Sequence, residues 1–145
     1  MAEFKVALSN PKDGRSYSIE VKGHHANSLV GKRMGEAVDG IFVGLPGYQL
    51  TITGGSDRSG TPMKKGIRTV GRKRALLSGG PCYSPSNSGV RKRKLVRGDS
   101  VSPDIWQINM AITKWGSRPI SLLLGTQEGE EENRTERRAD KNEDA

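Results

Sequence analysis

The chain has 145 residues, a formal net charge of +8 at pH 7 and only 32% hydrophobic residues. That length fits one domain with a tail, and the apolar fraction is well below the ~45–50% of an average globular domain. No apolar run approaches the ~20 residues of a membrane-spanning helix, and a lone cysteine, Cys82, excludes an intramolecular disulfide. The N-terminus leads directly into a strand pattern, so we expect no secretory signal.

The charge is divided between two regions of opposite sign. Residues 1–125 contain 20 basic and 8 acidic residues, a net +12, whereas residues 126–145 contain 4 basic and 8 acidic residues, a net −4. The second region has no aromatic residue and no aliphatic residue larger than alanine, so it has nothing to bury. We therefore predict one domain over 1–125 and a disordered acidic tail over 126–145.

The first half of the domain has the period-two alternation of half-buried strands. Apolar residues alternate with polar ones over 3–9 and 16–23, and the turn-rich segment between them predicts an antiparallel hairpin. Ala26 and Leu29 have helical spacing and predict a short helix near 25–30. Residues 41–43 could form a short strand, and residues 48–53 are predicted to form a longer one.

The second half is less regular. Only 11 of the 47 residues from 54 to 100 are apolar, too few for an independent core. Short strands are predicted near 73–78 and 92–97, a long one over 105–114, and a capping turn or helix over 120–124. Strands this short expose sheet edges unless the sheet closes. The predicted fold class is therefore all-β, a small antiparallel β-barrel with long basic loops and one short helix.

Residues 58–97, here called the basic segment, hold twelve Lys or Arg residues and no Asp or Glu. Concentrating like charges costs free energy unless a polyanion lies against them, and a nucleic-acid backbone is the simplest polyanion. The alternatives for its basic runs are a solvated face or a targeting signal. The candidate RNA-binding side chains are Arg58, Lys64, Lys65, Arg68, Arg72, Lys73, Arg74, Arg91, Lys92, Arg93, Lys94 and Arg97.

Two further groups in or beside this segment are candidate contacts. Tyr83 could stack on an unpaired base or pack against Leu77. Glycines let the backbone approach phosphate closely; the alternative for the loop over 54–63 is a hairpin turn whose glycines supply positive φ. The candidates for such an approach are Gly54, Gly55, Gly60, Gly79 and Gly80.

The chain offers little for catalysis or metal binding. The Gly-rich loop over 54–63 lacks the Gly-Lys-Ser/Thr ending of a nucleotide-binding loop. His24 and His25 are adjacent, so their side chains diverge and make a poor chelate. We expect no catalytic residue, metal, cofactor, small-molecule substrate or membrane partner. The acids near turns are expected to form caps and turn hydrogen bonds; they are Asp57, Asp99 and Asp104.

Several motifs occur together in order: GLPGY (44–48), TGGSD (53–57), GTPM (60–63), LLSGG (76–80) and RKRKLVRG (91–98). In this order and spacing they resemble the small-subunit ribosomal protein S6e family in its archaeal form, over about residues 4–125. The family usually has an aromatic where this chain has Thr61. Eukaryotic relatives carry a basic C-terminal helix with phosphorylated serines, whereas the tail here has no serine, so kinase regulation is not transferred.

The resemblance implies a non-enzymatic, rRNA-binding structural protein of the 30S subunit with a β-barrel core. Its implied partners are 16S-type rRNA and neighbouring small-subunit proteins, and its implied location is the cytoplasm, in the ribosome. The alternative is a free RNA- or DNA-binding β-barrel that acts as a chaperone or regulator. Composition does not separate the two.

Overall fold

The structure, a computed structural model, describes residues 2–124 and is mostly β. Over this range, two helices and one 3-10 helix, η1, accompany the strands. The elements are β1 (Glu3–Asn10), β2 (Arg15–Lys22), α1 (His24–Leu29), β3 (Ala37–Asp39), η1 (Gly40–Val43), β4 (Gln49–Asp57), β5 (Arg72–Leu77), β6 (Lys92–Arg97), β7 (Ile105–Lys114) and α2 (Ile120–Leu124).

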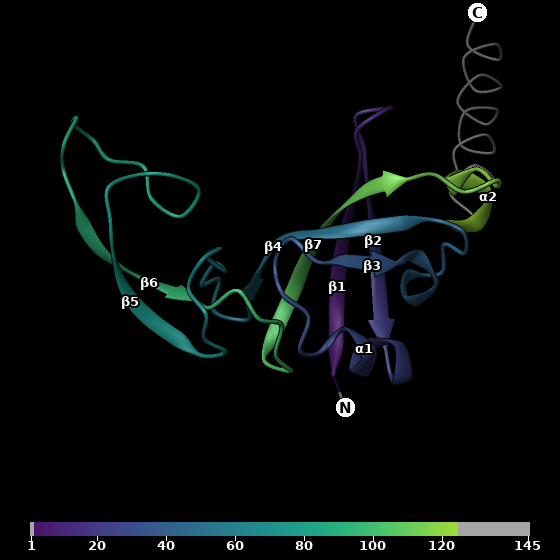
Figure 1. Cartoon of the computed structure of the whole chain (residues 1–145), viewed down its shortest axis with the longest axis horizontal. Helices are drawn as coiled ribbons and strands as arrows, with labels where there is room; N and C mark the ends of the chain where they lie inside the picture. Colours follow the sequence, from purple (N-terminus) through teal and green to yellow (C-terminus); the bar gives the residue numbers. More distant parts are fainter. Residues whose placement is uncertain (1, 125–145) are drawn as a thin grey trace, which may run out of the picture.

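Five strands form one curled sheet in the order β2-β1-β7-β4-β3 (Figure 1). The predicted hairpin is confirmed, because β1 and β2 pair antiparallel along their whole lengths, with Val6 opposite Ile19. The last strand, β7, lies at the centre, parallel to β1 and antiparallel to β4. The expectation of a purely antiparallel sheet is therefore wrong at the β1–β7 pair. Periodicity predicts where a strand lies but not the direction of its neighbour.

The predicted closed barrel is not confirmed. Within residues 2–124, β2 and β3 end the sheet and do not pair with each other. Both α1 and η1 contact β2, so the open side of this half-barrel is partly filled by the two short helices. The predicted strands near 73–78 and 92–97 exist but do not join the sheet; β5 and β6 form a separate two-stranded ribbon, here called the basic ribbon. It projects from the sheet at the left of Figure 1.

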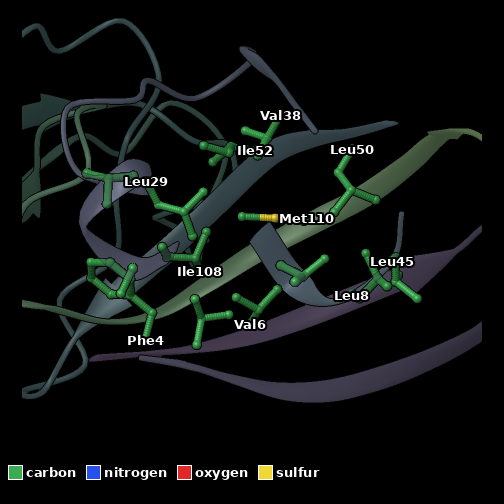
Figure 2. Packing of buried hydrophobic residues seen from close by; sticks show 14 of the residues in the cluster. Phe4, Val6, Leu8, Leu29, Val38, Leu45, Leu50, Ile52, Ile108 and Met110 are labelled. Carbon is green, nitrogen blue, oxygen red and sulfur yellow. The ribbon is translucent and has the colours of Figure 1, made fainter. Parts of the chain in front are cut away.

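The hydrophobic core lies on the inner face of the half-barrel (Figure 2). Alternate residues of β1, β4 and β7 point inward, and Leu29 of α1 and Leu45 after η1 cover them. The fully buried large side chains at this face include Val6, Leu8, Leu50, Ile52, Ile108 and Met110. In the ribbon, by contrast, only Leu77, Val96 and Arg97 are buried, and none belongs to this core cluster. The ribbon stays separate because it has too few apolar side chains to extend the core.

The remaining short elements are α1, η1 and α2. The predicted helix near 25–30 is confirmed as α1, and residues 120–124 form α2. The predicted strand over 41–43 is wrong, because this segment is η1, and the Asp39 side chain accepts a hydrogen bond from the Ile41 N–H at its start. A Cβ at Gly40 would overlap backbone oxygens of Leu45 and Tyr48, so only glycine fits at the start of η1. The predicted acidic tail lies outside the described residues.

Candidate nucleic-acid interface

The structure brings the two basic runs of the sequence together. Arg74 on β5 lies opposite Leu95 on β6, and Leu76 lies opposite Arg93, so basic residues from both runs share one short ribbon. Within residues 2–124, only Arg72 and Arg97 of the twelve basic residues make ion pairs with acidic side chains. Of the other ten, nine are exposed and Lys64 is half-buried. These uncompensated residues are Arg58, Lys64, Lys65, Arg68, Lys73, Arg74, Arg91, Lys92, Arg93 and Lys94.

Arg97 is placed differently from the rest of the basic segment. It is 5% exposed, and its Nη1 lies 3.2 Å from Oδ2 of Asp57. Its Nη2 donates to the Val70 carbonyl at 3.2 Å and to the Ser102 hydroxyl at 3.1 Å. A guanidinium that is buried and already hydrogen-bonded is not available to an external polyanion. We therefore remove Arg97 from the candidate RNA contacts.

Asp57, at the end of β4, accepts hydrogen bonds from Arg72 and Arg97. Its Oδ2 accepts from Nε of Arg72 at 2.9 Å and from Arg97, while its Oδ1 accepts from the backbone N–H groups of Ser59 at 3.0 Å and Thr61 at 2.9 Å. Burial by itself raises the pKa of Asp57, but the hydrogen bonds from Thr61, Arg72 and Arg97 outweigh it and the net pKa is lowered. This carboxylate therefore stays charged and fastens both strands of the basic ribbon to the sheet.

The expected turn role of Asp57 is confirmed by its bonds to Ser59 and Thr61, but sequence reasoning missed its ion pairs. One signal was present in the sequence. Asp57 is the last acid before 40 residues that contain twelve basic residues and no acid. A buried carboxylate needs a charged or hydrogen-bonding partner, so a basic segment that packs against one uses some of its cations in ion pairs.

Tyr83 lies in the loop between β5 and β6 and is half-buried. The ammonium group of Lys94 lies 5.7 Å from the centre of its ring, within reach of a cation–π interaction. Both border a cavity of about 290 Å³ that Lys92 and Ser84 also line. The ring therefore lies among the cations of the basic ribbon, a setting that suits stacking on a base.

The glycine candidates fall into two groups. Gly60 and Gly80 are exposed, with φ of 84° and 106°, and Gly79 is half-buried between β5 and Gly80. Gly54 and Gly55 instead lie inside β4 and pair with β7. A Cβ at Gly55 would meet the Gln107 carbonyl oxygen at 2.5 Å, so this glycine is needed for packing inside the sheet.

An exposed aromatic outside the basic segment was not predicted as part of the site. The Arg58 guanidinium lies 5.1 Å from the centre of the Trp106 ring, and Trp106 is 39% exposed. Arg58 also lines a hollow of about 680 Å³ with Asp57, Arg72 and Asp104, where the ribbon meets the sheet. The sequence placed Trp106 only on a strand and carried no indication of this stacking.

Residues 2–124 contain no group of three or more His, Cys, Asp or Glu side chains able to hold a metal ion. No helix over the same range is long and apolar enough to cross a membrane.

The fold is thus a small, mostly β domain that presents a strongly cationic surface on a projecting ribbon. The model of the family "Ribosomal protein S6e" matches residues 4–125, so the chain belongs to that family, as its motifs predicted. It is a family of ribosomal proteins, not of enzymes.

The chain is similar to archaeal proteins named small ribosomal subunit protein eS6. It is 44% identical to the one from Methanocella arvoryzae over 131 residues, which cover 90% of this chain and 92% of the relative. It is 50% identical to the one from Haloarcula marismortui over 125 residues, 86% of this chain and 97% of the relative. With the Archaeoglobus fulgidus protein it shares 46% identity over 127 residues, 87% and 98% of the two chains.

Proposed function

We propose that this protein is a structural constituent of the small ribosomal subunit, located in the cytoplasm within the ribosome, and that it binds rRNA through the basic segment. The observation that carries the proposal is the set of ten basic side chains that have no acidic partner within residues 2–124. The names of its archaeal relatives support the ribosomal assignment. The proposed RNA-contacting side chains are these ten, Tyr83 and the exposed half of Arg72.

The fold supports this use of the ribbon. The half-barrel has its own buried core, whereas the ribbon and its loops lack one. Phosphates along the ribbon would reduce the repulsion among its cations and supply contacts that a core cannot. Lysines would act as point charges, and arginines would also fork onto phosphates or stack on bases. The half-barrel would serve as the folded base from which the ribbon and the basic loops reach the RNA.

A salt titration with rRNA purified from archaeal small subunits tests the electrostatic mechanism. If about eight phosphate contacts form, log affinity falls with log salt at a slope of roughly −6, at ~0.7 per phosphate. Replacing Lys73, Lys92 and Lys94 together by alanine should reduce that slope by about 2. A matched variant with alanine at Lys5, Lys22 and Lys114, all exposed on the main sheet, should reduce it less. A slope near zero, or equal losses in both variants, contradicts the proposal.

Cosedimentation tests the ribosomal assignment against a free chaperone or regulator. A structural constituent stays with 30S particles through a moderate-salt wash, because many contacts must break together for it to leave. Release of the protein by that wash contradicts the assignment.

A further inference from the structure

The two faces of the basic ribbon carry different cations. Side chains alternate between the faces of a strand, and residues directly opposite each other share a face. From the pairing of β5 with β6, one face, here called the arginine face, carries Arg72, Arg74, Leu76, Arg93, Leu95 and Arg97. The opposite face, here called the lysine face, carries Lys73, Ala75, Leu77, Lys92, Lys94 and Val96. Every arginine of the two strands thus lies on one face and every lysine on the other.

The outer part of the arginine face exposes two leucines. Leu76 is 55% exposed and Leu95 is 43% exposed, and each lies opposite an arginine, Arg93 and Arg74 respectively. On the lysine face, the large aliphatic residues Leu77 and Val96 are buried instead.

At its inner end the arginine face is already occupied. Arg72 and Arg97 are held by Asp57, and both line the hollow of about 680 Å³ between ribbon and sheet. The free part of the arginine face therefore consists of two cross-strand pairs, Arg74 with Leu95 and Leu76 with Arg93. The hollow lies at the inner end of this surface.

Phosphates attract cations but cannot bury leucine side chains. An exposed leucine is stabilised only when an apolar surface removes it from water. Arginine is enriched and lysine depleted at protein–protein interfaces, because the guanidinium is more weakly hydrated and forks onto carboxylates. The lysine face carries three lysines and exposes no large aliphatic side chain, so it is better matched to the phosphates of RNA.

We propose that the arginine face docks a neighbouring small-subunit protein, through a segment that presents carboxylates beside apolar side chains, while the lysine face binds rRNA. In this division Arg72, Arg74 and Arg93 are reassigned from rRNA to the protein partner, and the other eight cations unpaired within residues 2–124 still contact rRNA. This inference depends on the proposed place of the protein in the small subunit. The acidic tail of the chain itself is a poorer occupant. It supplies carboxylates, but its residues 126–145 include no aliphatic residue larger than alanine to cover the leucines.

Photocrosslinking within assembled subunits tests this division. A photoreactive amino acid is placed at Leu76 in one variant and at Lys92 in another, and 30S particles that contain each are irradiated. Position 76 should crosslink to another small-subunit protein, at a peptide with both acidic and apolar residues, and position 92 to rRNA. Crosslinks from position 76 only to rRNA, only to this chain, or to nothing overturn the inference. If position 92 also fails to reach rRNA, the proposed RNA-binding function fails with it.

A second comparison uses the free protein. Replacing Leu76 and Leu95 by serine should leave its rRNA affinity and salt slope unchanged within about twofold, because both side chains are exposed and uncharged. The same variant should lose most of the protein crosslink at a photoreactive residue placed at Arg93. A loss of rRNA affinity equal to that of the triple lysine variant would show that the arginine face binds RNA, and would overturn the inference.

Discussion

Asp57 joins both strands of the basic ribbon to the sheet. Its carboxylate is the common partner of Arg72 from β5 and Arg97 from β6. Asp57→Asn removes the charge while keeping the size of the side chain. Because Arg97 would then be a buried cation without its partner, we expect a loss of about 3–5 kcal/mol in the free energy of unfolding, measured by urea denaturation.

The matched control is Asp104→Asn. The Asp104 carboxylate lies 3.9 Å from Arg97, but its side chain is 82% exposed. Surface pairs of this kind contribute little, so we expect a change within about 0.5 kcal/mol. Equal effects in the two variants would show that Asp57 does not hold the ribbon.

The lowered pKa of Asp57 also predicts a pH dependence. Because the folded-state pKa lies below the ordinary value of 3.8, the contribution of Asp57 to stability is fully present above that value. It is lost as the pH falls through the lower folded-state pKa. The stability difference between the native protein and Asp57→Asn should therefore stay constant from about pH 7 to pH 5 and shrink below about pH 4. Urea denaturation at each pH measures this difference. If the difference grows as the pH falls, the folded-state pKa of Asp57 is raised and not lowered.

At the scale of elements, the attachment of the ribbon also depends on close backbone packing at Gly98. A Cβ at Gly98 would overlap the Thr69 backbone carbonyl, and the Gly98 N–H donates to the Gly71 carbonyl at 3.2 Å. We expect Gly98→Ala to cost about 1–3 kcal/mol, because backbone cannot move aside as a flexible side chain can. Urea denaturation measures the loss, and amide hydrogen exchange shows whether 72–97 is affected first.

Gly71→Ala is the matched control at the same junction. A Cβ there meets nothing within 4 Å, so we expect a change within about 0.5 kcal/mol. If the two alanine variants unfold alike, the packing of Gly98 against Thr69 does not hold the ribbon in place.

The elements could largely be predicted from the sequence, but their arrangement could not. Alternation over 3–9 and 16–23, with a turn between, was enough for the hairpin, because that pairing is local. The parallel pairing of β1 with β7 joins residues about a hundred positions apart, and periodicity carries no information on it.

The candidate interface follows the same rule. The exposed cations could be predicted because the basic segment has no acid to pair with them. The burial of Arg97 could not, since in sequence it is one more cation in a basic run, and its partner Asp57 lies 40 residues earlier. The separation of arginines from lysines depends on the β5–β6 register, which sequence alone did not fix.

At the scale of the whole molecule, the opposite charges of the domain and the tail predict an effect on selectivity. Residues 126–145 carry a net −4 and residues 1–125 a net +12. If the tail screens the basic surface before assembly, deleting 126–145 should raise affinity for unrelated RNA and steepen its salt dependence. Filter binding at several salt concentrations measures both. Unchanged affinity for unrelated RNA would remove this role for the tail.

The central position of β7 has a consequence for the order of events during synthesis. Vectorial translation delivers β1, β2, β3 and β4 long before the strand that joins the two halves of their sheet. Until residue 114 emerges, the nascent chain exposes the apolar inner faces of the β1–β2 hairpin and of the β3–β4 pair, and such surfaces are prone to aggregation. A chain whose sheet is joined last would therefore gain from chaperone protection while it is still tethered to the ribosome that makes it.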